Sequence, residues 1–382
     1  MLDDLSVGYA EPVRLGGVEQ RTCSEIKRLS VAGLDRPELL HRTAERLKRA
    51  VPFQAYCAST VDPASNLITH GLADGFDMDD SASGNIFLDR IYFEEDLPQM
   101  ISMLDRGHNV QLLSETTGGH LDRSMRYREL LKPNGLGHEL GGAFVDGSMW
   151  GGMDLMREAG DPDFRSGEAA MVQRIAPHVG AGLRTATLRS RATSGLATED
   201  LPGVLTLDGS GYVVSHTPSA ERWLRDLEDL HPGWRKGNLP ITVRMVSGAL
   251  RRALSPQSDR DLNLIPRLRV RAHSGRWLAL YGSLTEPSDE RPSETVIVIQ
   301  PAKPEEVAWM NVAAYGLSAR EEEVVGLVVR GYSTRQISRS LFISEPTVQR
   351  HLSNTFEKVG VRGRRTLIKH LFFDNLLPDM PE

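Results

Sequence analysis

The chain has 382 residues, of which 40% are hydrophobic, 25% charged and only 6% aromatic, and its formal net charge at pH 7 is −6. That length predicts several domains, and the composition excludes collagen-like and disordered chains. Taken alone, the acidic balance disfavours a nucleic-acid partner. The two cysteines, Cys23 and Cys57, exclude a disulfide framework and a zinc site built on Cys-x-x-Cys pairs.

Neither a targeting signal nor a membrane span is indicated. Residues 1–5 are acidic, whereas a signal peptide begins with positive charge. Apolar runs such as 296–299 are far shorter than the roughly 20 residues that span a bilayer. We therefore expect a cytoplasmic protein with no membrane partner.

Segments rich in Pro, Gly and small polar residues divide the chain into three regions, 1–190, 200–303 and 315–376. The first region predicts one antiparallel sheet flanked by helices, an α+β fold. Helical periodicity marks four segments, at 37–51, 86–94, 121–131 and 166–183, and Ser166 is expected to cap the last. Strand patterns mark 53–60, 66–71, 139–145 and 149–157, the last two joined as a hairpin at Asp146 and Gly147.

The middle region predicts a second, smaller α+β unit. Strands are expected at 204–207, 212–215, 268–272, 276–284 and 294–300. Two helices lie between the second and third strands, one capped by Thr217 with Pro218 at its first position and one over 241–254. This order of elements is typical of small sensor domains.

The C-terminal region is expected to be all-α. Its helix starts are marked by Ser318, Ser333 and Ser344, and the first two form capping boxes with Glu321 and Gln336. Apolar residues spaced by four predict the buried stripe of the third helix, at Val348, Leu352 and Phe356. Gly360 ends that helix, and a fourth follows with Leu367, Ile368 and Leu371.

A short helix, a tight turn and a longer helix form a helix-turn-helix, whose second helix enters the DNA major groove. With the apolar stripe inward, the outward face of this helix carries four polar residues that suit base edges and phosphates, Gln349, Arg350, Ser353 and Asn354. Residues 317–372 hold ten Lys/Arg and five Asp/Glu, a net charge of +5. The tail 373–382 carries −3 and residues 1–316 carry −8, so the overall −6 conceals one basic segment.

These residues resemble the DNA-binding domain of LuxR-type transcriptional regulators. The resemblance rests on 317–324 (Leu-Ser-x-Arg-Glu-x-Glu-Val), Gly331, Ile337, Leu341, Ile343, Ser344, Thr347, Val348, His351, Leu352, Phe356, Lys358, Gly360 and Val361. It implies a four-helix domain that contacts bases through Gln349, Arg350 and Ser353. It further implies phosphate contacts from Ser333, Thr334, Arg335, Ser344, Thr347 and Lys358, and dimerisation through Leu367, Ile368 and Leu371. The sequence departs from the family pattern at Gln336, Ser338 and Gln349, so no operator sequence is carried over.

The upstream regions resemble sensor modules in the order of their elements. Region 1–190 resembles a GAF domain, and region 200–303 resembles a PAS domain, which implies ligand sensing, signal relay or dimerisation. A ligand pocket in the first region would draw on Phe53, Tyr56, Phe87, Tyr92, Tyr127, His138 and Trp150, although for each of them ordinary core packing is favoured over ligand contact. Neither region contains a phosphate loop, a nucleophile elbow or a metal-binding cluster of residues.

The resulting hypothesis is a homodimeric, DNA-binding transcription regulator, without enzymatic activity or bound cofactor, whose sensor domains respond to a small-molecule effector. RNA polymerase is a further expected contact. Three alternatives remain at this stage: a protein-interaction adaptor that uses its acidic body, a sigma-like promoter-recognition factor, and a nucleotide-handling enzyme related to GAF folds.

Overall fold

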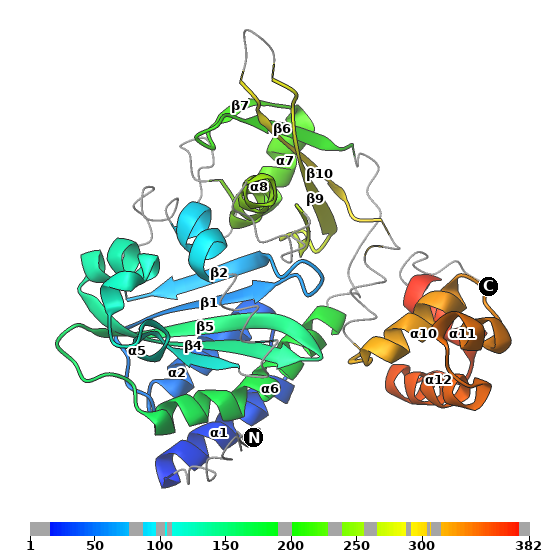
Figure 1. Ribbon diagram of the computed structural model, residues 1–382, viewed down its shortest axis with the longest axis horizontal. Coiled ribbons are helices and arrows are strands. Elements are labelled where there is room, and N and C mark those ends of the chain that lie inside the picture. Colours follow the sequence, from blue (N-terminus) through cyan, green and yellow to red (C-terminus); the bar gives the residue numbers. More distant parts are fainter. Residues whose placement is uncertain are drawn as a thin grey trace, which may run out of the picture.

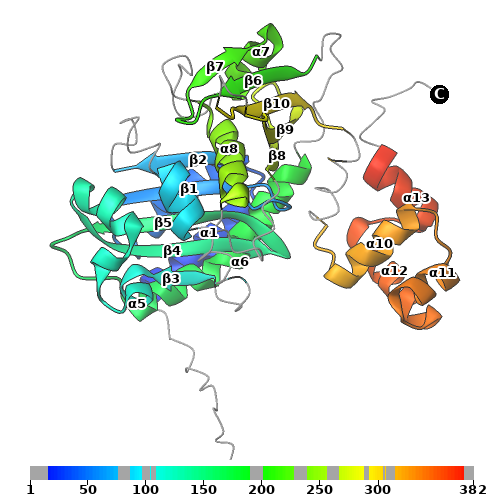
Figure 2. The same cartoon turned by 45° about the horizontal axis from the view of Figure 1, so that its top comes forward.

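The structure is a computed structural model, and it describes residues 16–75, 87–96, 104, 109–189, 201–227, 239–255, 266–287, 292–303, 306 and 315–373. Two antiparallel five-stranded sheets with helices are followed by a helical C-terminal region (Figures 1 and 2). In this described part of the chain, no helix is long and apolar enough to cross a membrane.

The first sheet has the strand order β2-β1-β5-β4-β3. Its strands are β1 (Ala55–Val61), β2 (Ile68–Asp74), β3 (Val110–Leu112), β4 (Leu136–Asp146) and β5 (Ser148–Glu158). The expected hairpin is confirmed: Asp146 pairs with Ser148 around Gly147, whose φ of 76° favours glycine. The three-residue strand β3 was not predicted, because so short a segment carries no periodicity.

Three helices, α1 (Gly17–Val31), α2 (Arg36–Leu47) and α6 (Ser166–Arg189), cover one face of this sheet (Figure 1). The expected cap Ser166 is the first helical residue, and the backbone N–H of Arg165 donates to the Glu168 carboxylate at 2.7 Å. Helix α1 was missed because two of its buried residues, Thr22 and Ser30, are polar. It approaches α6 closely: a Cβ on Gly182 would lie 2.8 Å from the Ser30 carbonyl oxygen.

The helices expected at 86–94 and 121–131 take less regular forms. The first is a π-helical segment, η1 (Phe87–Asp96), and Ile86 lies outside the described residues. The second breaks into short turns, η2 (Leu121–Arg123), η3 (Tyr127–Leu131) and η4 (Lys132–Asn134). The adjacent α5 (Leu113–Thr117) was not predicted.

The second sheet has the order β7-β6-β10-β9-β8. Its elements are β6 (Gly203–Leu207), β7 (Val213–His216), α7 (Pro218–Leu227), α8 (Ile241–Leu254), β8 (Arg267–Arg271), β9 (Trp277–Leu284) and β10 (Thr295–Pro301). The sequence predicted all seven. The Thr217 hydroxyl accepts from the backbone N–H of Ala220 at 3.3 Å, as expected of the cap of α7.

One hydrophobic cluster joins the two sheet domains. It includes Ile68 and Ile91 from the first domain together with Val246 and Leu280 from the second. Helix α8 packs against β2, η1 and its own sheet, so it lies between the domains (Figure 1). A Cβ on Gly248 of α8 would lie 2.2 Å from the Phe93 ring, so only glycine permits this approach.

A buried ion pair also crosses the same interface. The Asp62 carboxylate, 1% exposed, accepts from the Arg269 backbone N–H, Nε and Nη2 at 3.0, 3.1 and 3.0 Å. Arg269 also donates to the Glu306 carbonyl at 3.0 Å. The domains are therefore joined by directional bonds as well as by apolar contact.

The C-terminal region contains α10 (Ala319–Val329), α11 (Thr334–Leu341), α12 (Glu345–Val359), α13 (Arg364–Ile368) and η7 (Lys369–Phe373). Both expected capping boxes form, and the Ser344 hydroxyl accepts from the backbone N–H of Thr347 at 3.2 Å. These helices enclose their own core, with Val324, Ile337 and Leu352 at its centre.

Candidate nucleic-acid interface

Helix α12 has one buried and one exposed face. Val348, Leu352, Thr355 and Val359 are buried, whereas Phe356, expected in the stripe, is half-buried at its edge. The outward residues Gln349, Arg350, Ser353 and Asn354 are all exposed. A 15-residue helix is about 22 Å long, so one face of α12 presents a continuous polar surface.

The start of α12 itself and the start of α11 lie beside this surface. At the start of α11, Ser333 and Arg335 are exposed and Thr334 is half-buried, and at the start of α12 Ser344 is exposed and Thr347 half-buried. The backbone N–H groups and hydroxyls of a helix start suit phosphate oxygens. Five of the six residues expected to contact phosphate therefore lie at two neighbouring helix starts.

A hydrogen-bonded network around Thr334 holds α12 against α11. The Gln349 side-chain amide donates to the Thr334 hydroxyl at 3.2 Å, and Arg364 Nη2 donates to the same oxygen at 2.8 Å. Arg364 Nη1 also donates to the Tyr332 carbonyl at 2.9 Å. The sequence patterns missed Arg364, because its partners lie about 30 residues away. Gln349 is thus oriented from within the domain, which leaves its amide oxygen for an external donor.

Lys358 has a different environment from the other expected phosphate contacts. Its ammonium donates to the buried Glu321 carboxylate at 2.6 Å and to the Gly316 carbonyl at 3.1 Å. Burial raises the pKa of Glu321, but hydrogen bonds from Lys358 and Ser318 outweigh that effect and lower the pKa below its ordinary value. The structure therefore assigns Lys358 first to the junction of α10 and α12.

The three residues expected at a dimer interface differ in how deeply they are buried. Leu367 and Leu371 are fully buried in the core of their own domain, whereas Ile368 is half-buried. Of the three, only Ile368 offers part of its side chain to a partner. Leu367 and Leu371 are buried because α13 packs against α10, and α13 and η7 contribute them to the core of their own domain.

The turn between α11 and α12 is made by Phe342. This residue has a left-handed φ of 55°, caps α11 through a hydrogen bond from its N–H to the Ser338 carbonyl, and is 96% exposed. The Ser338 hydroxyl donates to the Ile343 carbonyl at 2.5 Å. Ser338, a departure from the family pattern, therefore braces the tight turn.

The aromatic residues proposed as a pocket in the first region are not brought together. Phe53, Tyr56 and Trp150 pack in one core cluster, Tyr92 in the interdomain cluster and Tyr127 beside a third. The side chain of Phe87 lies outside the described residues. The Trp150 indole N–H donates to the Asp146 carbonyl at 3.1 Å, and the Tyr92 hydroxyl donates to the Asn66 carbonyl at 2.9 Å. Ordinary core packing accounts for these residues.

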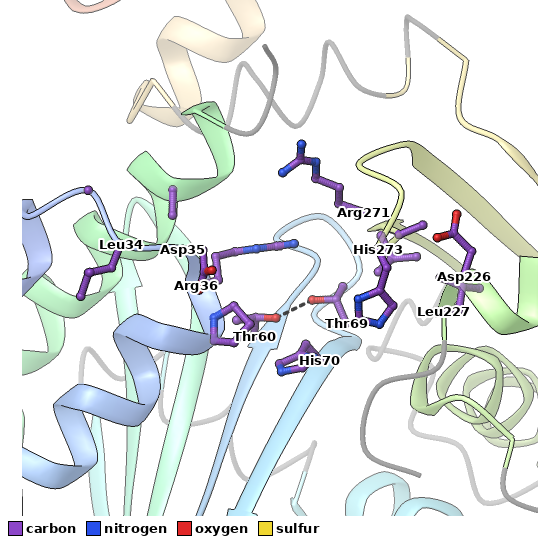
Figure 3. Close-up of a pocket in the computed structure, with 15 residues that line it drawn as sticks. Leu34, Asp35, Arg36, Thr60, Thr69, His70, Asp226, Leu227, Arg271 and His273 are labelled. Atoms are coloured by element: carbon purple, nitrogen blue, oxygen red, sulfur yellow. Dashed lines mark hydrogen bonds between the residues drawn. The ribbon is translucent and has the colours of Figure 1, made fainter. Parts of the chain in front are cut away.

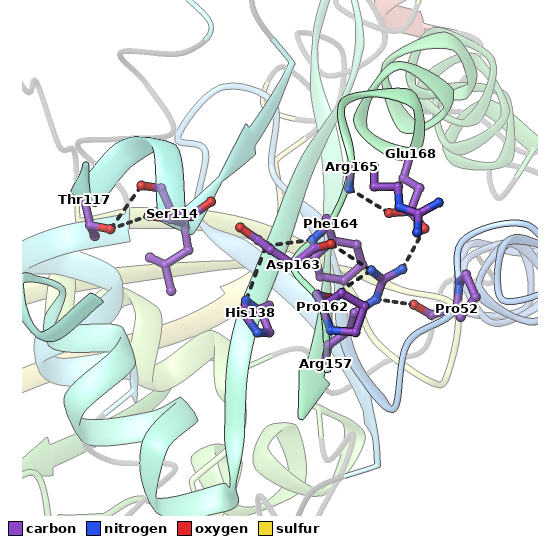
Figure 4. A network of polar contacts seen from close by, with 11 residues as sticks. Pro52, Ser114, Thr117, His138, Arg157, Pro162, Asp163, Phe164, Arg165 and Glu168 are labelled. Atoms are coloured by element: carbon purple, nitrogen blue, oxygen red, sulfur yellow. Dashed lines mark hydrogen bonds and ion pairs between the residues drawn. The ribbon is translucent and has the colours of Figure 1, made fainter. Parts of the chain in front are cut away.

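His138 belongs to a polar network at the start of α6 (Figure 4). Its Nδ1 lies 3.4 Å from the Asp163 carboxylate. Nearby, Arg157 donates to the Pro52 carbonyl at 2.7 Å and to Glu168 at 2.6 Å, and its guanidinium stacks 4.1 Å from the centre of the Phe164 ring. These contacts fix the entry into α6 and do not form a pocket with the aromatic residues above.

Comparisons with known proteins agree with the geometry of the C-terminal region. Residues 316–371 match the family described as "Bacterial regulatory proteins, luxR family". Over 55 residues the chain is 46% identical to the spore germination protein GerE of Bacillus subtilis (strain 168), a match that covers 14% of this chain and 74% of that protein.

Helices α11 and α12 with the turn at Phe342 are the helix-turn-helix of a DNA-binding transcription regulator. Such regulators act by binding DNA and not as enzymes. The chain belongs to the luxR family of bacterial regulatory proteins.

Proposed function

We propose that this protein is a homodimeric transcription regulator in which the first two domains control how α12 is presented to DNA. The observation that carries this proposal is the exposed polar face of α12 in a domain of net charge +5, held in orientation by the Thr334 network. An acidic body of net charge −8 would repel DNA, which confines contact to this one domain.

In the proposed complex, α12 lies in the major groove. Gln349, Arg350, Ser353 and Asn354 contact base edges, and Ser333, Thr334, Arg335, Ser344 and Thr347 contact phosphates. Lys358 reaches a phosphate only by leaving Glu321, so its main role is to hold α12 against α10. Two protomers place their recognition helices about 34–36 Å apart, and Ile368 contributes to the dimer contact in place of Leu367 and Leu371.

The control function is assigned to regions 1–190 and 200–303, for which GAF-like and PAS-like roles are proposed, and the DNA-binding region to 315–376. Two observations support this assignment. The upstream part of the chain forms two sheet domains, and the chain enters the DNA-binding region at Gly316, close to Arg184 of the first domain. A Cβ on Gly316 would lie 2.6 Å from Arg184 Nη1, and Arg184 forms a 2.9 Å ion pair with Asp146. An effector that favours one arrangement at this junction shifts the population of DNA-binding states. RNA polymerase is a proposed contact of the DNA-bound form.

Genome-wide footprinting followed by gel-shift titration of the full chain tests the proposal. We expect a two-fold-related site, relaxed base choice for Arg350→Ala, and weaker binding with a flatter salt dependence for Arg335→Ala. Arg320→Ala is the matched control, because Arg320 pairs with Glu323 on α10. A wild-type chain that shows no preferred site among genomic fragments refutes the proposal.

A further inference from the structure

A cavity of about 350 Å³ lies between the first and middle domains (Figure 3). The first domain contributes the start of α2 and the adjoining ends of β1 and β2, and the middle domain contributes the end of α7, the end of β8 and the turn after it. This volume suits a small organic molecule. Among the described residues, none of those expected to form a pocket lines this cavity.

Basic side chains from both domains line the cavity. Arg36 and His70 come from the first domain, and Arg271 and His273 from the middle domain (Figure 3). The two carboxylates in the lining already accept hydrogen bonds: Asp35 from the Glu38 N–H at 2.9 Å, and Asp226 from the Ser274 N–H at 2.7 Å. The two aspartates match the two arginines in formal charge, but their carboxylates are engaged at the start of α2 and at the turn after β8, at opposite sides of the cavity lining.

The buried polar groups of the lining favour a ligand that carries negative charge. His70 Nε2 is buried and, among the described residues, has no hydrogen-bond partner. Burial and the neighbouring Arg271 lower the pKa of Arg36 to about 10. Burial, followed by the charges of Arg36 and His273, lowers the pKa of His70 to about 4. An added negative charge would offset the repulsion between Arg36 and Arg271, and it would accept a hydrogen bond from His70 Nε2 when that nitrogen carries a proton.

We propose that this interdomain pocket binds a small organic anion carrying a carboxylate or a phosphate group. Arg36 and Arg271 hold the oxyanion from opposite domains, and His70 supplies a further donor when protonated. The Thr60 and Thr69 hydroxyls, 2.7 Å apart, add polar lining beside it. This site would be where the effector of the proposed function binds, and it defines the chemical class of that effector. Anion binding is argued from the structure alone, and only its regulatory role rests on the proposed function.

The experiment measures anion binding to the full chain without DNA. Benzoate and phenyl phosphate are titrated at constant ionic strength, with neutral benzamide as the isosteric control, and thermal unfolding and calorimetry report binding. We expect at least one anion to bind saturably and raise Tm by a few degrees, and benzamide to do neither. Comparison of the two anions tells a carboxylate site from a phosphate site.

Variants locate the bound anion. Arg36→Gln and Arg271→Gln should each weaken the apparent Kd at least tenfold, whereas Arg42→Gln, an exposed arginine on the same helix as Arg36, should not. Because each arginine comes from a different domain, a folding defect in one variant leaves the other informative. Binding should also raise the pKa of His70, measured by NMR.

Three results overturn the site: neither anion binds saturably, benzamide binds as well, or both pocket variants keep wild-type affinity. Gel-shift titration of the same preparations keeps the two proposals apart. Specific DNA binding together with any of these three results refutes the anion site alone. Anion binding without specific DNA binding refutes the proposed function alone.

Discussion

The ion pair between Asp62 and Arg269 makes the closure of the two sheet domains open to direct measurement. Asp62→Asn keeps the size of the side chain but removes its charge and one acceptor oxygen. Asp62 accepts two hydrogen bonds from the Arg269 guanidinium and one from the Arg269 backbone N–H. In the variant, the guanidinium would therefore stay buried without a counter-ion. Breaking a buried pair from one side costs about 3–5 kcal/mol. At 1.4 kcal/mol per factor of ten, the lower bound is a change of roughly 100-fold in the opening equilibrium.

Hydrogen exchange on the full chain, resolved by peptide, measures that opening. We expect exchange in peptides covering 61–68 and 267–271 to accelerate by roughly 100-fold in Asp62→Asn, and exchange in α12 to stay unchanged. The exposed pair Glu38–Arg42, at 2.6 Å, is the matched control, and Arg42→Met should change local stability by only about 0.3–0.5 kcal/mol.

A double-mutant cycle separates the pair from its surroundings. Arg269→Met leaves Asp62 buried and unpaired, whereas the double variant Asp62→Asn/Arg269→Met removes both charges. The double variant should be more stable than the sum of the single effects predicts, by about 2 kcal/mol. Equal exchange in Asp62→Asn and in Arg42→Met, or acceleration spread evenly over α12, would refute a local clamp between the domains.

Three further predictions concern other parts of the chain. Gly248→Ala places a Cβ 2.2 Å from the Phe93 ring and should cost about 1–3 kcal/mol by urea denaturation, whereas Gly17→Ala, with no atom within 4 Å, should cost little. His70 binds a proton less readily in the folded state (pKa about 4) than in the unfolded state (pKa about 6.5), so stability is lost as pH falls from about 6.5 towards 4. The difference in Tm between pH 7.5 and 5 should therefore shrink in His70→Gln, and an unchanged difference would contradict this assignment. Glu321 has a lowered folded pKa, so its contribution is present above pH 4.5 and is lost at lower pH. Glu321→Gln should destabilise the C-terminal domain at pH 7 and flatten its acid unfolding monitored by circular dichroism, while the exposed Glu357→Gln should do neither.

Local signals in the sequence were sufficient for the DNA-binding domain. Capping residues, spacing by four and turn glycines act over a few residues, and α10, α11 and α12 begin at the expected capping serines. The same signals located α8 and the strands of the second sheet. They failed for α1, whose packing on α6 depends on polar and small residues such as Ser30 and Gly182.

The interdomain features could not be predicted for a different reason. The interdomain pocket combines His70, Arg36 and Arg271 from segments up to about 235 residues apart, and Asp62 and Arg269 are separated by 207 positions. No spacing rule connects such residues, because their proximity follows from the docking of two finished domains. The described aromatic residues of the expected pocket lie in three separate hydrophobic clusters, because aromatic side chains gain most from burying their large apolar area in a core.

The hydrophobic cluster shared by the two sheet domains limits how this protein can be divided or recombined. The sequence of residues 191–200 is typical of a domain boundary. Separating the chain there would nevertheless expose Ile68 and Ile91 on the first fragment and Val246 and Leu280 on the second. Each fragment would carry an apolar patch of the kind that drives aggregation. Gene fusions that join the upstream part of this chain to another DNA-binding domain should therefore transfer both sheet domains together.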